Sequence, residues 1–474
     1  MLGAMRHWVA CVLALAVTAA CNAARAEPGA EPRAALEPLA RSLVDGQYCS
    51  GVVVALIPAS GSPQILAWGE TARGNGKLPD GNTVFEIGSV SKTFTSLVLA
   101  EAVIDKQVTL DTPVATLLPK AKLPAGRRAI TLLDLATHTS GLPRMPDNLH
   151  PADAENPYAD YTEDQLFAFL GTATLGREPG AKYEYSNLGA ALLGQALARR
   201  GKADWATLVA TQITRPLART STMVALTDDA RARFAQGYDG DGEPAKPWDL
   251  PTFAGAGALR STANDLVTFV KAELAASKRA TSRLARAMAL TQTPQRDLDD
   301  DPPPGAGSPR PGRKIGLAWH ISPDGTIWHN GQTGGYHSYV AFRPSSQVGV
   351  VVLANGGAPV VDKLGNAALA AVAGEPVPAT LDLPSDRPVD DKTLESYVGS
   401  YALSPAFVIT IARRGGKLYG QATGQPRIRL HATSARDFAI LSASASITFE
   451  VDAGGKVTAL VLHQGGIDRR AARQ

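Results

Sequence analysis

The chain has 474 residues, of which 45% are hydrophobic and 19% are charged, so it is long enough for two or three globular domains. Its formal net charge is only +3 at pH 7. A charge this small gives no reason to expect a nucleic-acid partner.

The first 26 residues have the pattern of a secretory signal peptide. Arg6 precedes an apolar run over 8–20, and a small-x-small cleavage site ends at Ala26. The run is too short for a stable membrane span. We therefore expect export to the periplasm with cleavage after Ala26. A lipid-anchored form attached through Cys21 is the alternative.

The following region begins and ends with strand patterns and is helical between them. Strands are predicted at 51–57 and 64–68 and then at 315–321, 326–329, 338–342 and 349–353. Helices are predicted from Ser89, at 130–137, 163–170, 188–199 and 205–213, from 262, and at 366–372. This order predicts an α+β fold, in which an antiparallel sheet is assembled from both ends of the region.

Two further segments are predicted to be irregular. Residues 144–161 are polar and aperiodic, which predicts a long loop over a cleft. Residues 296–313 contain consecutive aspartates and prolines, which predict a disordered insertion or surface loop without a chemical role.

The character of the sequence changes after a proline-rich linker at 375–387. Short strands are predicted at 407–411, 418–422, 428–430, 438–441, 447–451 and 457–463. Their even spacing predicts a small antiparallel β-barrel. The expected organisation is a signal peptide at 1–26, a first domain at 27–374, the linker, and a barrel domain at 388–474.

Ser89 and Lys92 lie three residues apart at the start of an apolar helical segment. This spacing places both side chains on one helix face, where the Lys92 amine can take the proton of the Ser89 hydroxyl. The unpaired N–H groups of a helix start also favour an oxyanion. An isolated Ser-x-x-Lys is common and usually means a capped helix with an exposed lysine, so the prediction depends on two further motifs.

The second motif is Tyr185-Ser186-Asn187, between the turn at 178–180 and the predicted helix from 188. It would direct the Tyr185 phenol and the Asn187 amide into a cleft. The alternative is a buried tyrosine beside a capping Ser-Asn pair.

The third motif is His329-Asn330-Gly331-Gln332, at the end of a strand. Its glycine lets another backbone approach closely. The strand edge can then bind an extended substrate, and the Gln332 N–H can complete an oxyanion hole with the N–H of Ser89. The alternative is a glycine-rich hairpin loop with an exposed histidine.

The three motifs, in this order, resemble those of the penicillin-recognising serine hydrolases. Because its second motif begins with tyrosine, the sequence resembles in particular the class C β-lactamase branch, peptidase family S12. This branch also includes D-alanyl-D-alanine carboxypeptidases, D-aminopeptidases and esterases. The segments 135–143 and 257–262 also resemble scaffold segments of this family, so the resemblance covers about residues 40–372. The resemblance implies a β-lactamase/transpeptidase-like sheet flanked by helices, and the carboxyl-terminal domain is similar to a lipocalin-like barrel found in some S12 peptidases.

By this resemblance, Ser89 is acylated while Lys92 and Tyr185 share the proton transfer, and which of the two is the base stays open. The implied substrate-binding and oxyanion-binding residues are Asn187, His329, Gly331 and Gln332. No metal or cofactor is expected, because the eight histidines show no ligand-like clustering with cysteine or carboxylates.

The third motif departs from the Lys-Thr-Gly that is usual in lactamases of this branch. Histidine is mostly neutral at pH 7, so His329 would attract a substrate carboxylate less strongly than lysine. We expect an exported hydrolase that cleaves an amide of D-amino-acid, peptidoglycan-type peptides or of β-lactams through a Ser89 acyl-enzyme. A carboxylesterase of the same fold is one alternative, and a penicillin- or peptide-binding or sensing protein without turnover is another. The expected partner is a small-molecule or peptide substrate, with self-association through the barrel as an open question.

Overall fold

A computed structural model describes the chain from residue 30 to its end, except for residues 241, 299–311, 384–385, 405–406, 424–426, 441–444 and 465–466. The predicted signal peptide and the alternative lipid site at Cys21 lie outside the described residues. So does most of the predicted surface loop at 296–313.

Within the described residues, the first part of the chain forms one eight-stranded antiparallel sheet. In order across the sheet, its strands are β2 (Gln64–Gly69), β1 (Gly51–Ile57), β10 (Val348–Ala354), β9 (His337–Arg343), β8 (Ile327–Gln332), β7 (His320–Ile321), β6 (Lys314–Ile315) and β5 (Arg296–Asp297). The early strand β1 lies between β2 and the late strand β10, with Val52 opposite Ala354. The predicted sheet, assembled from both ends of the region, is therefore confirmed.

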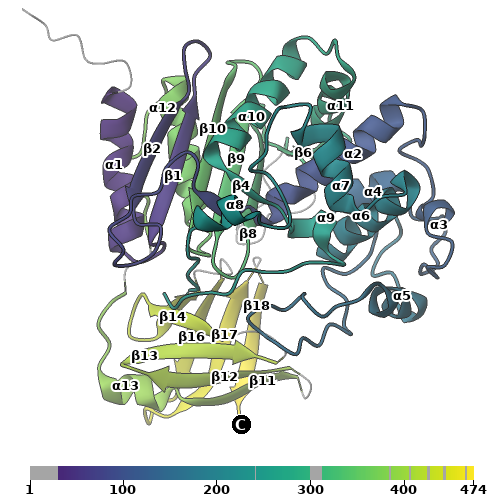
Figure 1. The fold of residues 1–474 in the computed structure, drawn as a ribbon. Helices are drawn as coiled ribbons and strands as arrows, with labels where there is room; N and C mark the ends of the chain where they lie inside the picture. Colours follow the sequence, from purple (N-terminus) through teal and green to yellow (C-terminus); the bar gives the residue numbers. More distant parts are fainter. Residues whose placement is uncertain are drawn as a thin grey trace, which may run out of the picture.

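Helices cover both faces of this sheet (Figure 1). On one face lie α1 (Ala30–Asp45) and α12 (Val361–Ala373). On the other face lies α10 (Ala263–Lys278), with α11 (Arg283–Gln292) and α2 (Ser91–Ile104) packed beyond it. The α+β fold class predicted from the sequence is confirmed.

The remaining helical segments are mostly short. They are α3 (Val114–Leu117), α4 (Leu132–Ala136), α5 (Glu163–Thr172), α6 (Asn187–Gly201), α7 (Trp205–Val209) with the π-helical turn η2 (Ala210–Thr214), α8 (Asp228–Ala232) and α9 (Ala254–Gly257). The helix predicted over 205–213 thus changes its hydrogen-bonding pattern after Val209. Two predicted caps are confirmed, because Thr131 accepts the N–H of Asp134 and Thr262 accepts that of Asp265.

The strand β1 is buried along its whole length because helices cover both sides of the sheet. Val52 and Val54 contribute to the core beneath α1 and α12, whereas Val53 and Ala55 contribute to the core beneath α10. Burial on both faces explains why this antiparallel strand reads as an unbroken apolar run.

Three parts of the sequence-based assignment are wrong. A continuous strand over 315–321 does not form, because the chain reverses direction at 316–319, where Ala318 has φ +64°, and β6 then pairs with β7 in antiparallel register. The segment 296–313 is not entirely a loop, since its first two described residues form β5 and pair with β6. The helices α1 and α11 were not predicted, although Leu36, Leu39 and Leu43 form a buried face on α1 at helical spacing.

The carboxyl-terminal region forms a closed antiparallel barrel, as predicted. Its strands are β11 (Gly399–Ser404), β12 (Phe407–Arg414), β13 (Lys417–Ala422), β14 (Ile428–Ala432), β15 (Asp437–Ile440), β16 (Ala445–Val451), β17 (Val457–Gln464) and β18 (Ile467–Arg473), preceded by α13 (Asp391–Ser396). The unpredicted strands β11 and β18 close it, with Tyr401 opposite Arg473. In Figure 1 the barrel lies below the sheet and its helices.

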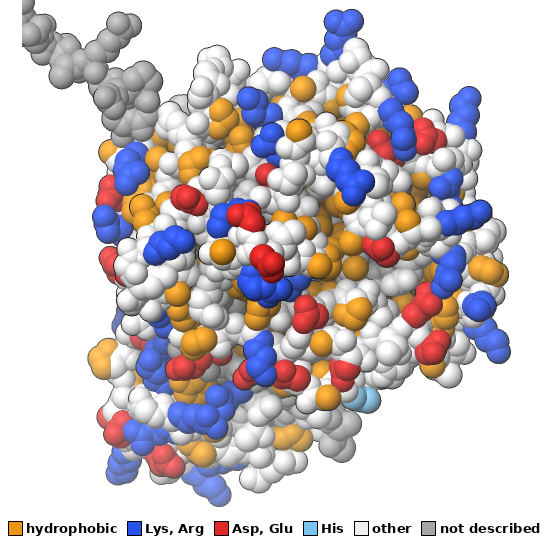
Figure 2. All heavy atoms as spheres, in the orientation of Figure 1, with side chains coloured by type: hydrophobic (Ala, Val, Ile, Leu, Met, Phe, Trp, Pro, Cys, Tyr) orange, Lys and Arg blue, Asp and Glu red, His pale blue; other side chains and the backbone are white. Residues whose placement is uncertain are grey.

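Charges of both signs are interspersed on the face shown in Figure 2, which agrees with the small net charge. Among the helices of the described residues, none has both the length and the apolar character needed to cross a membrane.

Candidate active site

Ser89 and Lys92 lie where a short strand meets the start of α2. The strand β3 (Val84–Glu86) pairs with β4 (Arg260–Thr262) and leads into the 3₁₀ turn η1 (Gly88–Val90). Ser89 lies in this turn, and Lys92 lies in the first turn of α2. The Lys92 Nζ is 2.8 Å from the Ser89 Oγ. The spacing therefore brings the two groups into hydrogen-bond contact, as predicted.

Two glycines let the third motif approach Ser89 at the level of the backbone. Gly88 has φ +47°, and a Cβ at this position would lie 2.6 Å from the Gln332 N. A Cβ on Gly331 would lie 2.0 Å from the Ile87 carbonyl oxygen and 2.8 Å from the Ser89 N. Only glycine fits at either position. The backbone N–H groups predicted to form an oxyanion hole thus belong to two segments in direct contact.

The Lys92 amine is almost completely buried, with a side chain that is 2% exposed. Its Nζ also donates a hydrogen bond to the Ala256 carbonyl at 2.7 Å. Burial, together with the positive charge of Arg144, lowers the pKa of Lys92 well below its usual value. A neutral amine beside the Ser89 hydroxyl is therefore favoured.

Tyr185 contacts both members of the first motif. Burial raises the pKa of Tyr185 to about 12, although a hydrogen bond with Ser89 and the charge of Arg144 act in the opposite direction. Its ring centroid lies 5.0 Å from the Lys92 Nζ. The phenol is therefore protonated at neutral pH, while the neighbouring lysine tends to lose its proton.

His138 stacks on the ring of Tyr185, with the two ring centroids 4.3 Å apart. The Ser186 N–H donates to His138 Nδ1 at 3.2 Å, so the ring proton resides on Nε2. This Nε2 is buried and has no hydrogen-bond partner among the described residues. Burial and nearby positive charges, Lys92 first among them, lower the pKa of His138 well below its usual value. His138 is therefore a neutral ring packed against Tyr185.

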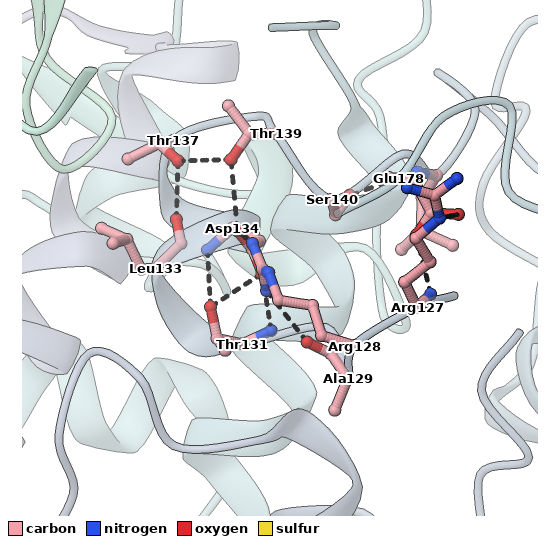
Figure 3. Close-up of polar contacts among 11 residues, drawn as sticks. Arg127, Arg128, Ala129, Thr131, Leu133, Asp134, Thr137, Thr139, Ser140 and Glu178 are labelled. Atoms are coloured by element: carbon pink, nitrogen blue, oxygen red, sulfur yellow. Dashed lines mark hydrogen bonds and ion pairs between the residues drawn. The ribbon is translucent and has the colours of Figure 1, made fainter. Parts of the chain in front are cut away.

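The turn that carries His138 is held by Asp134 (Figure 3). Arg128 binds both carboxylate oxygens of Asp134, at 2.6 and 2.8 Å, and Thr131 donates to the same group. Thr139 donates its N–H to the Asp134 carbonyl at 2.8 Å. His138 itself has φ +56°, an uncommon conformation for a residue with a Cβ. Asp134 thus links the capped start of α4 to the turn after its other end, where His138 packs against Tyr185.

The second motif is tied to the segment just after this turn. Ser186 Oγ donates to the Pro143 carbonyl at 2.6 Å, and the Asn187 N–H donates to the Arg144 carbonyl at 3.0 Å. The Asn187 amide contacts the Met145 Sδ at 3.6 Å and lines a cavity next to Ser89. Asn187 therefore lies where the sequence predicted it, facing the same space as the serine.

His329 of the third motif is completely buried, at 0% exposure. Its Nδ1–H donates to the Asn330 carbonyl at 2.5 Å, which leaves Nε2 as an unprotonated nitrogen without a partner in the described part of the chain. Burial lowers the pKa of His329 well below its usual value, and the nearness of two other groups that can carry positive charge, His320 and Lys92, acts in the same direction. The alternative of an exposed hairpin histidine is wrong, and this ring carries no charge at neutral pH.

The cavity beside Ser89 has an aromatic wall. Its lining residues are Gly88, Ser89, Tyr158, Asn187, Trp248, Leu250, Phe253, Ala256, Gly257, Gln332 and Thr333. Tyr158 comes from the long loop predicted over a cleft, and its ring lies 5.2 Å from that of Trp248 and 5.3 Å from that of Phe253. The prediction of that loop is confirmed.

Sequence reasoning missed four side chains that surround these motifs: His138, Arg144, Tyr158 and Trp248. The first two belong to or follow the phrase at 135–143, which was interpreted only as scaffold. The presence of an ionisable side chain, His138, in this turn-rich segment could have indicated a functional role. For Tyr158 and Trp248 the sequence offers no local pattern, because both lie in irregular segments.

Comparison with known proteins gives consistent results. A family model described as β-lactamase matches residues 36–375, and a model described as a domain of unknown function (DUF3471) matches residues 383–472. The chain is 30% identical over 341 residues to the D-alanyl-D-alanine-carboxypeptidase/endopeptidase AmpH of Escherichia coli (strain K12), covering 69% of this chain and 86% of that protein. It is 26% identical over 360 residues to a β-lactamase of Pseudomonas fluorescens, covering 68% of this chain and 93% of that protein.

A solved structure is also similar. The D-alanine carboxypeptidase AmpC from Burkholderia cenocepacia superposes with a TM-score of 0.59 at 26% identity, covering 72% of this chain and 98% of that one. The resemblance found from the three motifs is therefore confirmed at the level of the family. The chain belongs to the β-lactamase family and is an enzyme of the serine hydrolase type.

Proposed function

We propose that this enzyme cleaves amide bonds in D-amino-acid peptides of the peptidoglycan type, and β-lactams as a second substrate class, through an acyl-enzyme on Ser89. The observation that carries the proposal is the contact of 2.8 Å between the Ser89 Oγ and the buried Lys92 Nζ. The D-alanyl-D-alanine carboxypeptidase named among its relatives supports a peptide substrate.

Lys92 is the general base in this proposal, and Tyr185 is the proton donor. The Ala256 carbonyl can only accept, so it takes one N–H of the amine and leaves the nitrogen lone pair for the Ser89 hydroxyl. As the Ser89 Oγ attacks the substrate carbonyl, its proton moves to Lys92. The protonated Tyr185 phenol, in contact with Ser89, then passes a proton to the leaving nitrogen and is reprotonated from Lys92.

The remaining site residues bind the substrate in this proposal. The N–H groups of Ser89 and Gln332 stabilise the oxyanion, and Gly331 permits their approach. Asn187 binds the amide carbonyl of the substrate, and the aromatic wall with Tyr158 receives the acyl side. His329 supports the strand edge as a buried neutral ring. Water then releases the acyl group from Ser89.

The test is the release of D-alanine from an N-acylated peptide ending in D-Ala-D-Ala, with benzylpenicillin hydrolysis measured in parallel. The wild type is expected to release D-alanine, and the Ser89→Ala variant is expected to release none while it unfolds at the same temperature. The matching L-Ala-L-Ala peptide serves as the stereochemical control. Undiminished D-alanine release by Ser89→Ala would refute the proposal.

Three further statements about the whole protein are part of this proposal. The protein is exported and begins at Glu27 after cleavage, which amino-terminal sequencing of the mature form tests. Its domains span 27–374 and 388–474, joined by the linker at 375–387, and limited proteolysis in that linker tests this division. Self-association through the barrel is tested by light scattering of the full chain and of a chain ending at 387.

A further inference from the structure

Arg144 is held next to the second motif by its own backbone. Its carbonyl accepts the N–H groups of Asn187 and Leu188 at 3.0 and 3.2 Å. The preceding residue, Pro143, accepts the Ser186 hydroxyl. The position of Arg144 is therefore fixed relative to Tyr185, even though its segment has no regular secondary structure.

The Arg144 side chain extends over Tyr185, with its Cζ 5.1 Å from the ring centroid. Lys92 also approaches this ring, but Lys92 is buried whereas Arg144 is exposed. No ion pair between Arg144 and a carboxylate is present among the described residues. A permanently charged guanidinium, with its planar set of donors, is thus exposed to solvent over the ring of Tyr185.

The groups around the site respond to the Arg144 charge. It adds to the burial that lowers the pKa of Lys92 and His138, and it opposes the burial that raises the pKa of Tyr158 and Tyr185. Lys92 and His138 are buried, and Tyr158 and Tyr185 are half-buried, so the charge of Arg144 is only partly screened from them by water. Burial is the largest cause of all four shifts, so the guanidinium makes only a secondary contribution to the pKa values at the site.

The other cationic candidates at the site are unsuited to binding an anion. His329 is completely buried and neutral. Lys92 has its Nζ engaged by the Ser89 Oγ and the Ala256 carbonyl. Arg144 is the side chain here that combines positive charge with solvent exposure.

We propose that the Arg144 guanidinium binds a carboxylate on the leaving group of the substrate and so selects for substrates with an acidic leaving portion. This assignment rests on the proposed function, in which Tyr185 delivers a proton to the leaving group. The leaving group therefore passes Tyr185, and Arg144 lies over that ring. Arginine forms bidentate hydrogen bonds with carboxylates, which gives both affinity and orientation.

The test uses two aryl esters with the same N-acylglycyl group, one releasing phenol and the other releasing 3-hydroxybenzoate. The Arg144→Ala variant is expected to lose about 10- to 100-fold in kcat/KM for the carboxylated ester, mostly through KM. Its kcat/KM for the phenyl ester should stay within about twofold. Arg144→Lys, which keeps the charge but not the planar fork, should lose less. Arg127→Ala is the matched control, since its side chain is 90% exposed.

Each other outcome has a definite meaning. Equal losses on the two esters would assign Arg144 to the support of Tyr185 and overturn carboxylate binding. Unchanged kinetics on both esters would overturn the proposal as well. A wild type that hydrolyses neither ester would overturn the selection for an acidic leaving group, whereas the proposed function is judged separately by the release of D-alanine from the D-Ala-D-Ala peptide. Hydrolysis of both esters that is lost in Ser89→Ala would show that the two esters report on the same site.

Discussion

Both regions of the chain bury tyrosines, but they use the hydroxyl groups differently. In the barrel, the Tyr397 hydroxyl donates to the Ala435 carbonyl at 2.9 Å, and the Tyr401 hydroxyl donates to the Tyr397 carbonyl at 2.8 Å. In the first region, the Tyr185 hydroxyl interacts with Ser89, a group that can react. The barrel hydroxyls stabilise the fold through backbone partners, whereas the Tyr185 hydroxyl is available for chemistry.

The same contrast holds for other buried polar groups. The core of the barrel is aliphatic and aromatic, with Tyr397 stacked on Phe449 at 3.9 Å between ring centroids, and its buried polar groups, His431 and the Nε atoms of Arg413 and Arg429, lie outside that cluster. The first region buries Lys92, His138 and His329, and both histidines have a ring nitrogen without a partner among the described residues. Each such group costs about 1–3 kcal/mol of stability. In the first region these buried groups are packed around Tyr185, where they surround the reactive serine.

Replacing Lys92 by methionine tests this contrast with the largest expected effect. The variant loses the proposed base, so kcat/KM should fall at least about 10³-fold. Its melting temperature should stay equal or rise, because a thioether is easier to bury than an amine. The measurement is ester hydrolysis together with thermal unfolding, and Lys120→Met, at an exposed position, is the control. Activity within tenfold of the wild type would contradict the role of Lys92.

The pH dependence of the wild type follows from the same group. Because the pKa of Lys92 is lowered, its amine is neutral above that lowered value and protonated below it. The kcat/KM value should therefore fall as the pH decreases through the Lys92 pKa. Tyr185, with a pKa of about 12, should remain protonated throughout the accessible range. A rise of kcat/KM towards acid pH would be inconsistent with this assignment.

Replacing Phe449 by alanine tests the other side of the comparison. Phe449 is 1% exposed in the barrel core, so its truncation should cost about 3–5 kcal/mol of barrel stability. The kcat/KM of protein that is still folded should not change, since the site residues described above all belong to the region before the barrel. Urea unfolding followed beside ester hydrolysis checks both statements. A loss of kcat/KM before the barrel unfolds would mean that the barrel contributes to the site.

Glu273 is a buried ionisable group, and replacing it should change the stability of the protein less than Phe449→Ala does, by an amount that depends on pH. Burial raises the pKa of Glu273 to about 8, against 4.5 for an exposed glutamate, while a hydrogen bond from Gln292 acts in the opposite direction. The folded state therefore keeps a proton that the unfolded chain releases, so stability is full below about pH 4.5 and falls as the pH rises through 8.

The Glu273→Gln variant has no carboxyl group at this position and should not lose stability in this way. Between pH 4.5 and pH 9, the difference in the free energy of unfolding between the variant and the wild type should therefore shift in favour of the variant by up to about 4 kcal/mol. Chemical denaturation at the two pH values measures it. Glu243→Gln, at an exposed position, should behave as the wild type. An equal pH dependence in Glu273→Gln and the wild type would rule out Glu273 as the cause.

The sequence was sufficient to predict the elements whose patterns are local. The strand β1 is a continuous apolar run, and the caps Thr131 and Thr262 precede their helices at the usual spacing. The barrel strands β11 and β18 were missed because one is interrupted by serine and tyrosine and the other is rich in arginine. Their strand conformation depends on pairing with each other across the closure of the barrel.

The site was predictable to the extent that its residues belong to short motifs. Ser89 and Lys92 are brought together by helical spacing alone. The position of Arg144 over Tyr185 depends on hydrogen bonds from Asn187 and Leu188 to its carbonyl, between segments more than 40 residues apart, and no local pattern encodes these. The burial of His329 likewise results from the packing of the sheet, whereas the sequence shows only its place at a strand end.

The most direct test of the central claim is to identify the residue that an aryl phosphonate modifies, because such reagents trap activated serines without depending on the identity of the substrate. Intact-mass spectrometry and peptide mapping should find a single phosphonyl group on Ser89 in the wild type, slow labelling in Lys92→Met, and none in Ser89→Ala. Labelling of another residue, equal labelling of Ser89→Ala, or no labelling of the folded wild type would contradict the claim that Ser89 is the nucleophile.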